Sequence, residues 1–313
     1  MISIYKNTML DSEIKQLDNI EEGAWINIVA PSEQELLFIS KKTGVSLEFL
    51  RSPLDEEETS RIDIEDNNML VIVDIPFTEM EDNSLTYDTY PLAIIHTETN
   101  LITVCLKNSK ILTDFINRKF KSFYTFKRSR FILQILYRVA SYYLIYLRQI
   151  DKKSVMIEKR LHKSMKNKEL ILLLSLEKSL VYFSTSLKSN EITLEKMLKL
   201  ELIQKYPEDQ DVLEDVIIEN KQAIEMATIY SNILSGTMDA FASVISNNLN
   251  IVMKLLASIT IVMSIPNIIF GSFGMNVNGI PFNNSQQAFW LVYGVTAILC
   301  VVCIIILKRR DLL

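Results

Sequence analysis

From Leu255 to Leu307 the chain contains no Asp, Glu, Lys, Arg or His residue. A transmembrane helix needs roughly 20 consecutive apolar residues to cross the hydrocarbon core of a bilayer. The block is long enough for two crossings, which we place at about 253–273 and 288–307. Every charged residue lies in the first 254 positions or the last six, so we expect a large soluble part followed by a small membrane part.

Basic residues flank the two predicted spans on one side only. Lys254 lies at the start of the first span and Lys308, Arg309 and Arg310 follow the second, whereas the segment 277–287 has no basic residue. Under the positive-inside rule, both ends of this hairpin face the cytoplasm. The chain opens on a strand-like alternation rather than a cationic and apolar leader, so we expect the N-terminal part to stay in the cytoplasm as well.

The first 125 residues predict an α/β domain. Short β-branched runs at 25–29, 69–73 and 101–105 are typical of strands. Between the first two of these runs, Ser32 and Glu35 have the spacing of a capping box, which predicts a helix after Pro31.

Long helices follow the α/β domain. Apolar residues recur at every third or fourth position from about residue 131 to 205, which predicts two or three helices within 126–206, with breaks near 165–168 and near Asn190. Pro207 marks a stop, and a new helix is predicted to begin near Asp209 or Asp211 and to run to Phe273. At 1.5 Å per residue it would be on the order of 90 Å long.

We interpret 207–273 as a stalk helix that continues into the first span. The remaining segments are an outer loop at 274–287, the second span at 288–307 and a basic cytoplasmic tail at 308–313. A helical periodicity this long needs partners to bury its apolar stripe, which favours self-association into a bundle.

Composition argues against an enzyme and against a nucleic-acid-binding protein. The chain has two histidines, His96 and His162, and no Gly-rich phosphate loop. Its net charge is −5, which disfavours general nucleic-acid binding. The basic residues between Lys119 and Arg130 form a local patch, which is typical of a solvated helix start.

One face of the first predicted span is polar through the depth of the membrane. Thr260, Ser264, Asn267 and Gly271 are spaced four, three and four, so they share a helix face. Small, weakly polar residues also serve as helix-packing contacts, which alone would account for Thr260 and Ser264. An amide in hydrocarbon is costly unless it faces water or another helix, so Asn267 favours a water-filled lining. The whole stripe is Asn250, Met253, Leu256, Thr260, Ser264, Asn267 and Gly271.

Several copies of this helix around an axis would enclose a conduit without formal charge. Hydroxyl, amide and carbonyl oxygens suit the waters around a hard cation, and Mg²⁺ sheds those waters reluctantly. The carboxyl ends of the helices would also carry partial negative charge at the outer mouth. The stripe therefore predicts a path for a hydrated divalent cation.

The C-terminal part resembles the CorA family of magnesium channels. The resemblance rests on the tripeptide Gly274-Met275-Asn276 between two terminal spans, on Pro266 within the first span and on the basic tail. It implies an α+β fold with a cytoplasmic α/β domain, a helical stalk and a two-helix transmembrane hairpin. It also implies a funnel-shaped homopentamer in a bacterial inner membrane, with no nucleic-acid partner.

The resemblance also implies roles for individual residues. Gly274, Met275 and Asn276 would bind the hydrated ion as a selectivity filter, the stripe would line the pore, and Met253 and Leu256 would form a hydrophobic gate. A regulatory Mg²⁺ would bind between subunits at Asp215. Its candidate partners are Glu65 and Asp66.

These expectations combine into a passive Mg²⁺ uptake channel, closed by cytosolic Mg²⁺ and also permeable to Co²⁺ or Ni²⁺. Mg²⁺ would then be both the transported and the regulatory ion. One alternative is a related protein that transports Zn²⁺, but Met275 argues against this alternative. Another is a non-conducting, membrane-anchored metal sensor, which would leave the polar stripe unexplained.

Overall fold

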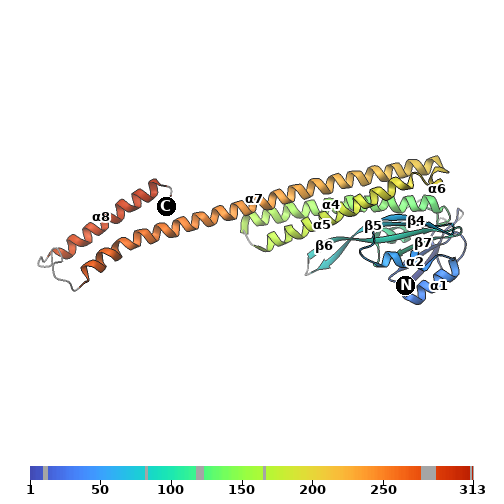
Figure 1. Cartoon of the computed structure of the whole chain (residues 1–313), viewed down its shortest axis with the longest axis horizontal. Helices are drawn as coiled ribbons and strands as arrows, with labels where there is room; N and C mark the ends of the chain where they lie inside the picture. The colour runs from blue at the N-terminus through green and yellow to red at the C-terminus, as the bar shows by residue number, and fades with distance from the viewer. Residues whose placement is uncertain are drawn as a thin grey trace. The chain divides into compact units, whose positions relative to one another are not determined.

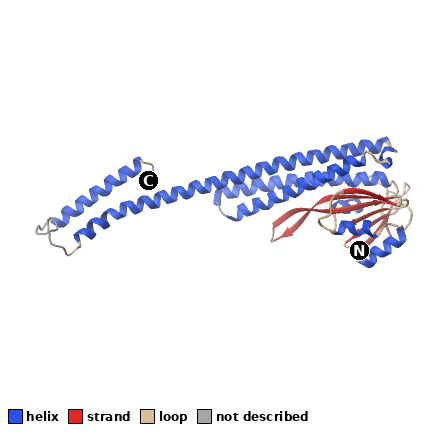
Figure 2. Cartoon of the chain, in the orientation of Figure 1, coloured by secondary structure: helices blue, strands red, loops and turns tan. Residues whose placement is uncertain are grey.

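The computed structural model describes residues 1–9, 13–81, 84–117, 123–164, 167–275, 287–310 and 312. The chain divides into two compact units, Met1–Gly236 and Thr237–Leu313. Figures 1 and 2 show that the sheet belongs to the first unit and that the second is helical.

The described part of the first unit contains one mixed sheet of seven strands in the order β2-β1-β3-β7-β6-β5-β4. Its strands β3 and β7 are parallel, and all other neighbours are antiparallel. The strands are β1 (Ile2–Lys6), β2 (Lys15–Leu17), β3 (Trp25–Val29), β4 (Arg61–Glu65), β5 (Asn68–Glu81), β6 (Ser84–His96) and β7 (Leu101–Cys105). The three runs predicted as strands are confirmed as β3, part of β5 and β7.

Two short helices cover one face of the sheet. They are α1 (Glu33–Thr43) and α2 (Leu47–Arg51), followed by the 3-10 helix η1 (Ser52–Leu54). The predicted capping box is present, with Glu35 N donating to Ser32 Oγ and Ser32 N donating to Glu35 Oε2. Buried residues of α1 and α2, including Leu36 and Phe49, join those of β3 and β5 to β7 in one apolar core.

The other face is covered by α3 (Lys110–Ile116) and by the much longer α4 (Arg128–Ser164) and α5 (Asn167–Met197). Aromatic pairs join these helices to the sheet. The rings of Trp25 and Phe131 pack edge to face with 5.2 Å between their centroids, and those of Tyr87 and Phe183 do so with 6.5 Å. Edge-to-face contacts of this kind add to the free energy gained by burial. The predicted break near 165–168 is confirmed, because α4 ends at Ser164 and α5 begins at Asn167.

The predicted break near Asn190 is wrong, because α5 continues through this residue to Met197. Asn190 is buried, and its side chain binds the sheet rather than its own helix. Its Oδ1 accepts a hydrogen bond from Asp74 N at 2.9 Å, and its Nδ2 donates to Asp74 O at 2.8 Å. Asparagine favours turns when its side chain binds nearby backbone. Here the side chain instead binds the backbone of β5, which is distant in sequence, so the helix continues.

The chain then forms α6 (Glu201–Gln204), α7 (Pro207–Phe273) and α8 (Ala288–Arg309). The stalk range predicted as 207–273 coincides with the bounds of α7, whereas the helix start expected near Asp209 or Asp211 was two to four residues late. Proline is well suited to the first helical position, because its missing N–H would have no partner there. Within the first unit α7 lies along α5, where Asn220 Nδ2 donates to Leu187 O at 3.0 Å and Lys221 pairs with Glu195 at 3.1 Å.

Candidate functional site

Three described helices are long and apolar enough to cross a membrane by length and composition: α5, α7 and α8. The first of these, α5, was not predicted to span. It is part of the core of the first unit, since Leu173, Leu180 and Phe183 are buried and Asn190 binds the sheet. A helix that covers a sheet in this way cannot face lipid on all sides, so α7 and α8 are the candidates for the spans.

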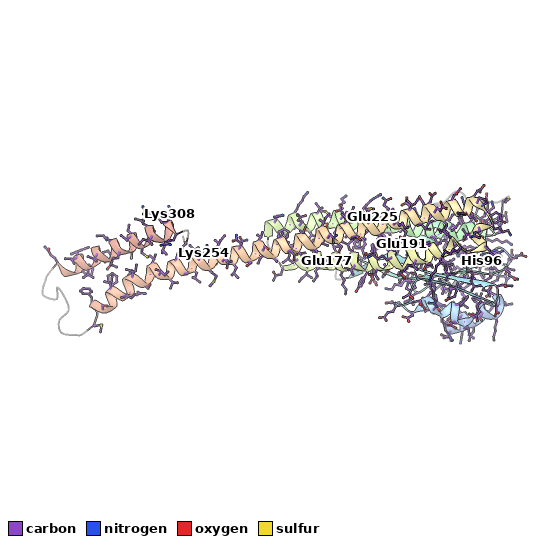
Figure 3. All side chains as sticks on the ribbon, turned by 45° about the horizontal axis from the view of Figure 1, so that its top comes forward. His96, Glu177, Glu191, Glu225, Lys254 and Lys308 are labelled. Carbon is purple, nitrogen blue, oxygen red and sulfur yellow. The ribbon has the colours of Figure 1, made fainter. Side chains whose placement is uncertain are left out.

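Within the second unit α7 and α8 contact each other along one side of α7. Ser258 is 1% exposed, and its Oγ donates to the Leu312 carbonyl at 2.5 Å. Farther along, the Cys300 thiol donates a weak hydrogen bond to the Val262 carbonyl at 4.0 Å. Figure 3 shows Lys254 of α7 and Lys308 of α8 at the same end of this pair.

The polar stripe lies on the opposite side of α7. Each residue turns an α-helix by about 100°. Val262 contacts Cys300 of α8, and Ser258 contacts Leu312 just beyond the end of α8. Each is two positions from Thr260, so both lie roughly 160° around the helix from it. In a single chain α8 therefore leaves the stripe uncovered.

Exposure agrees with this geometry. Met253 and Leu256 are 56% and 57% exposed, and Asn250, Thr260, Asn267 and Gly271 are also exposed, whereas Ser264 is intermediate. The hydroxyls of Thr260 and Ser264 donate to carbonyls of their own helix, at 2.8 Å each. Their lone pairs stay available to water, because a hydroxyl accepts as well as donates.

The tripeptide begins where α7 ends. Gly274 N donates to the Phe270 carbonyl at 2.9 Å, which closes the last turn. A Cβ at position 274 would lie 3.2 Å from the same carbonyl oxygen, so a larger residue would press on the helix end. Met275 is exposed. Asn276 lies outside the described residues.

An aromatic cluster joins the two helices beside this helix end. The rings of Phe270 and Tyr293 stack with 6.2 Å between centroids, and Phe289 lies 6.2 Å from Tyr293. With Phe273, Gly274 and Val292 these residues line a cavity of about 440 Å³. The sequence prediction missed this cluster, although aromatic residues near a span end are typical of a membrane interface.

The three acidic residues predicted at a regulatory site lie on two elements of the first unit. Asp215 is exposed on α7, and Glu65 and Asp66 are exposed where β4 turns into β5. Positive φ angles of 46° and 64° at Asp66 and Asn67 form a tight two-residue turn. No group of three or more His, Cys, Asp or Glu side chains able to hold a metal occurs among the residues that the structure describes, so one chain does not bring these three together as a metal site.

A family model described as "CorA-like Mg2+ transporter protein" matches residues 21–309. The chain belongs to this family. The predicted resemblance to CorA proteins is thereby confirmed, and membership in a transporter family agrees with the prediction that the chain is not an enzyme.

Comparisons with individual CorA proteins agree. The chain is 28% identical over 296 residues to the cobalt/magnesium transport protein CorA of Methanocaldococcus jannaschii, covering 92% of this chain and 90% of that protein. The complete structure of the CorA magnesium transporter from the same organism matches with a TM-score of 0.82 at 26% identity, covering 99% of this chain and 98% of that chain. The likeness bears out the α+β fold with a soluble domain and long helices.

A more distant structure shares the fold alone. The full-length CmaX protein matches with a TM-score of 0.71 at 16% identity, covering 99% of this chain and 96% of that chain.

Proposed function

We propose that this protein is a passive Mg²⁺ uptake channel of the cell membrane, assembled as a homopentamer with both termini in the cytoplasm. The observation that carries the proposal is the polar stripe of α7, which is exposed and lies opposite the contacts with α8. A ring of chains that turned this face inward would enclose a hydrated path, with α8 on the outside toward lipid.

Ion selection at the outer mouth would depend on hydrogen bonds to the ion's water shell. The free carbonyls at the end of α7 carry partial negative charge beside Gly274 and Met275, and the Asn276 amide would add an oxygen acceptor. Co²⁺ and Ni²⁺ would follow the same path, because a site that reads the hydrated ion discriminates weakly between ions of similar size and hydration.

Opening and closing would occur at Met253 and Leu256. Both side chains are more than half exposed in the single chain, so in a ring they would project toward the axis and exclude water. Cytosolic Mg²⁺ bound at Asp215 of one subunit, with Glu65 or Asp66 of the next, would hold the ring closed by bridging acidic groups that otherwise repel. When internal Mg²⁺ falls, the repulsion would widen the gate.

The membrane potential supplies the driving force without ATP. Moving one elementary charge through 100 mV corresponds to about 2.3 kcal/mol, so a divalent cation gains roughly 4.6 kcal/mol. Lys254 and Lys308, at one end of the α7–α8 pair (Figure 3), would mark the cytoplasmic side.

The test is Mg²⁺ uptake into liposomes that contain the purified protein, with an imposed inside-negative potential and low internal Mg²⁺. We expect uptake by the parent chain, loss of uptake with Asn276→Ala, and parent-like uptake with Asn283→Ala, which removes a similar amide from the same loop. Folded parent protein that passes no Mg²⁺ would refute the channel and favour the anchored sensor.

A further inference from the structure

Three segments of the first unit that are far apart in sequence enclose a cavity of about 550 Å³. They are the end of β6 at His96, residues 126–130 at the start of α4, and residues 205–209 at the start of α7. Figure 3 shows His96 at the end of the unit where α7 begins. The volume lies within the range of about 300–1,000 Å³ that is typical of small-molecule sites.

The cavity carries an excess of positive charge. Its cationic side chains are Lys127, Arg128, Arg130 and Lys205, and its carboxylates are Glu208 and Asp209. Arg130 is already neutralised, because it lies 3.0 Å from the Asp209 carboxylate and also donates to the Glu208 carbonyl. Within the described part of the chain the other three cations make no salt bridge.

The start of α4 adds to this excess. Arg128 is the first residue of this helix, and its guanidinium donates to the carbonyl of Glu98. Burial lowers the pKa of Arg128, although the charges of Glu22 and Glu98 act against the fall. The lowered pKa indicates that water solvates this charge incompletely. The first turn contains no acidic residue, so basic side chains lie at the positive end of the helix dipole, an unfavourable arrangement that a bound anion would relieve.

His96 contributes an uncharged side chain to the lining of the cavity. Burial, and secondarily the charge of Arg128, lower the pKa of His96 to about 4. Its imidazole is therefore uncharged near neutral pH, and it can donate one hydrogen bond and accept another.

Two aromatic rings give the same cavity an apolar surface. Phe126 is 37% exposed and Tyr206 is 51% exposed, and both line the cavity. Lys205 Nζ lies over the Tyr206 ring, 5.6 Å from its centre, so a cation and an exposed aromatic ring lie together in the lining. A ligand that matches this lining carries several negative charges and a flat aromatic group.

We propose that this cavity binds a nucleoside polyphosphate, with its phosphates on Lys127, Arg128 and Lys205 and its base against Phe126 or Tyr206. Since the chain has no Gly-rich phosphate loop, side-chain cations rather than a loop of backbone amides hold the phosphates. The bound molecule joins the first turn of α4 to the first turn of α7. The inference does not depend on transport.

The test is equilibrium binding of ATP, in EDTA to remove Mg²⁺, to the purified full chain in detergent, measured by titration calorimetry. We expect saturable binding that Lys127→Ala and Lys205→Ala each weaken about tenfold or more, since each removes a charge-assisted hydrogen bond. Both lysines are exposed, so the fold should survive. The control is Lys199→Ala, an exposed lysine outside the cavity, which should bind like the parent.

A second comparison separates the base from the phosphates. Tyr206→Ala should weaken ATP binding about fivefold or more, because it removes an aromatic contact, but should leave binding of inorganic tripolyphosphate unchanged. The nucleotide assignment is wrong if the parent binds tripolyphosphate as tightly as ATP. The site itself is wrong if ATP does not bind, or if the two lysine variants bind as the parent does.

Discussion

The side-chain amide of Asn190 takes the place of a neighbouring strand for Asp74. It accepts from the Asp74 N–H at 2.9 Å and donates to the Asp74 carbonyl at 2.8 Å, while Ser60 Oγ donates to Asn190 Oδ1 at 2.8 Å. Strand β4 pairs with β5 only up to Ile72, so no strand lies beside Asp74 on that edge. On its other side Asp74 is in register with Pro91 of β6. One helical asparagine thus completes the hydrogen bonding of a strand.

Asn190→Ala should destabilise the protein by about 2 kcal/mol, because it leaves the Asp74 N–H without its partner in a partly buried place. The Asp74 carbonyl keeps one hydrogen bond, from the Tyr143 hydroxyl at 3.1 Å. Thermal unfolding of the full chain, followed by circular dichroism, measures the effect. Asn232→Ala removes an exposed amide of α7 and should change stability by less than about 0.5 kcal/mol. Equal midpoints for the two variants would contradict the role given to Asn190.

Asp74→Asn should stabilise the protein at alkaline pH. Burial raises the pKa of Asp74 to about 6, although a hydrogen bond from Ser186 acts against the rise. With a pKa higher in the folded than in the unfolded chain, the contribution of this group is fully present below the unfolded pKa, near 4, and is lost as pH rises through about 6.

The uncharged amide should therefore raise the free energy of unfolding by about 2–3 kcal/mol at pH 8, and by about half as much at pH 5. Melting curves at the two pH values give the comparison. Asp18→Asn, on an exposed residue, should show no such pH-dependent gain. A constant difference between parent and Asp74→Asn across this range would show that the carboxyl does not titrate as described.

Asn267→Leu should reduce Mg²⁺ uptake at least tenfold, because an apolar side chain at this point of the stripe favours dewetting of the path. Asn248→Leu makes the same chemical change at an exposed position outside the stripe, roughly 120° around α7 from Thr260, and should retain uptake. Flux into liposomes loaded with a Mg²⁺-sensitive dye distinguishes the two. A pore lined by another face would instead give normal flux with Asn267→Leu.

Asp215→Asn should abolish the inhibition of uptake by internal Mg²⁺ while keeping the maximal rate. The neutral amide cannot provide the charge that the proposed regulatory site needs. Uptake is measured against internal Mg²⁺ concentration, with Asp211→Asn, also exposed and one turn earlier on α7, as the control. Inhibition at the same Mg²⁺ concentration in Asp215→Asn and the parent would remove Asp215 from the regulatory site.

What the sequence predicts well depends on short-range geometry. Ser32 and Glu35 are three residues apart, and the stripe from Asn250 to Gly271 depends only on the helical period, so both followed from spacing. The side of α7 that contacts α8 could not be predicted in this way, because it depends on tertiary contacts such as that of Val262 with Cys300, which no local pattern encodes.

The errors have the same origin. Asn190 was predicted as a break because its preference for turns was considered without Asp74, which lies 116 positions away. Pro207 was interpreted as a stop before the helix, although proline is equally suited to the first helical residue. The cavity between α4 and α7 also depends on tertiary structure, since the sequence showed only a basic patch at the start of one helix.

The parallel pairing of β3 with β7 affects the order in which the first unit can be completed during synthesis. Strands β1 to β3 leave the ribosome first, but β3 must wait for β7, which follows the long β5–β6 hairpin. Until residue 105 emerges, β3 and β6 each present an open edge able to pair with another chain. A nascent chain that stops before β7 would therefore carry two unfinished sheets. The pairing of β7 with both β3 and β6 closes these edges and so protects the growing protein from aggregation.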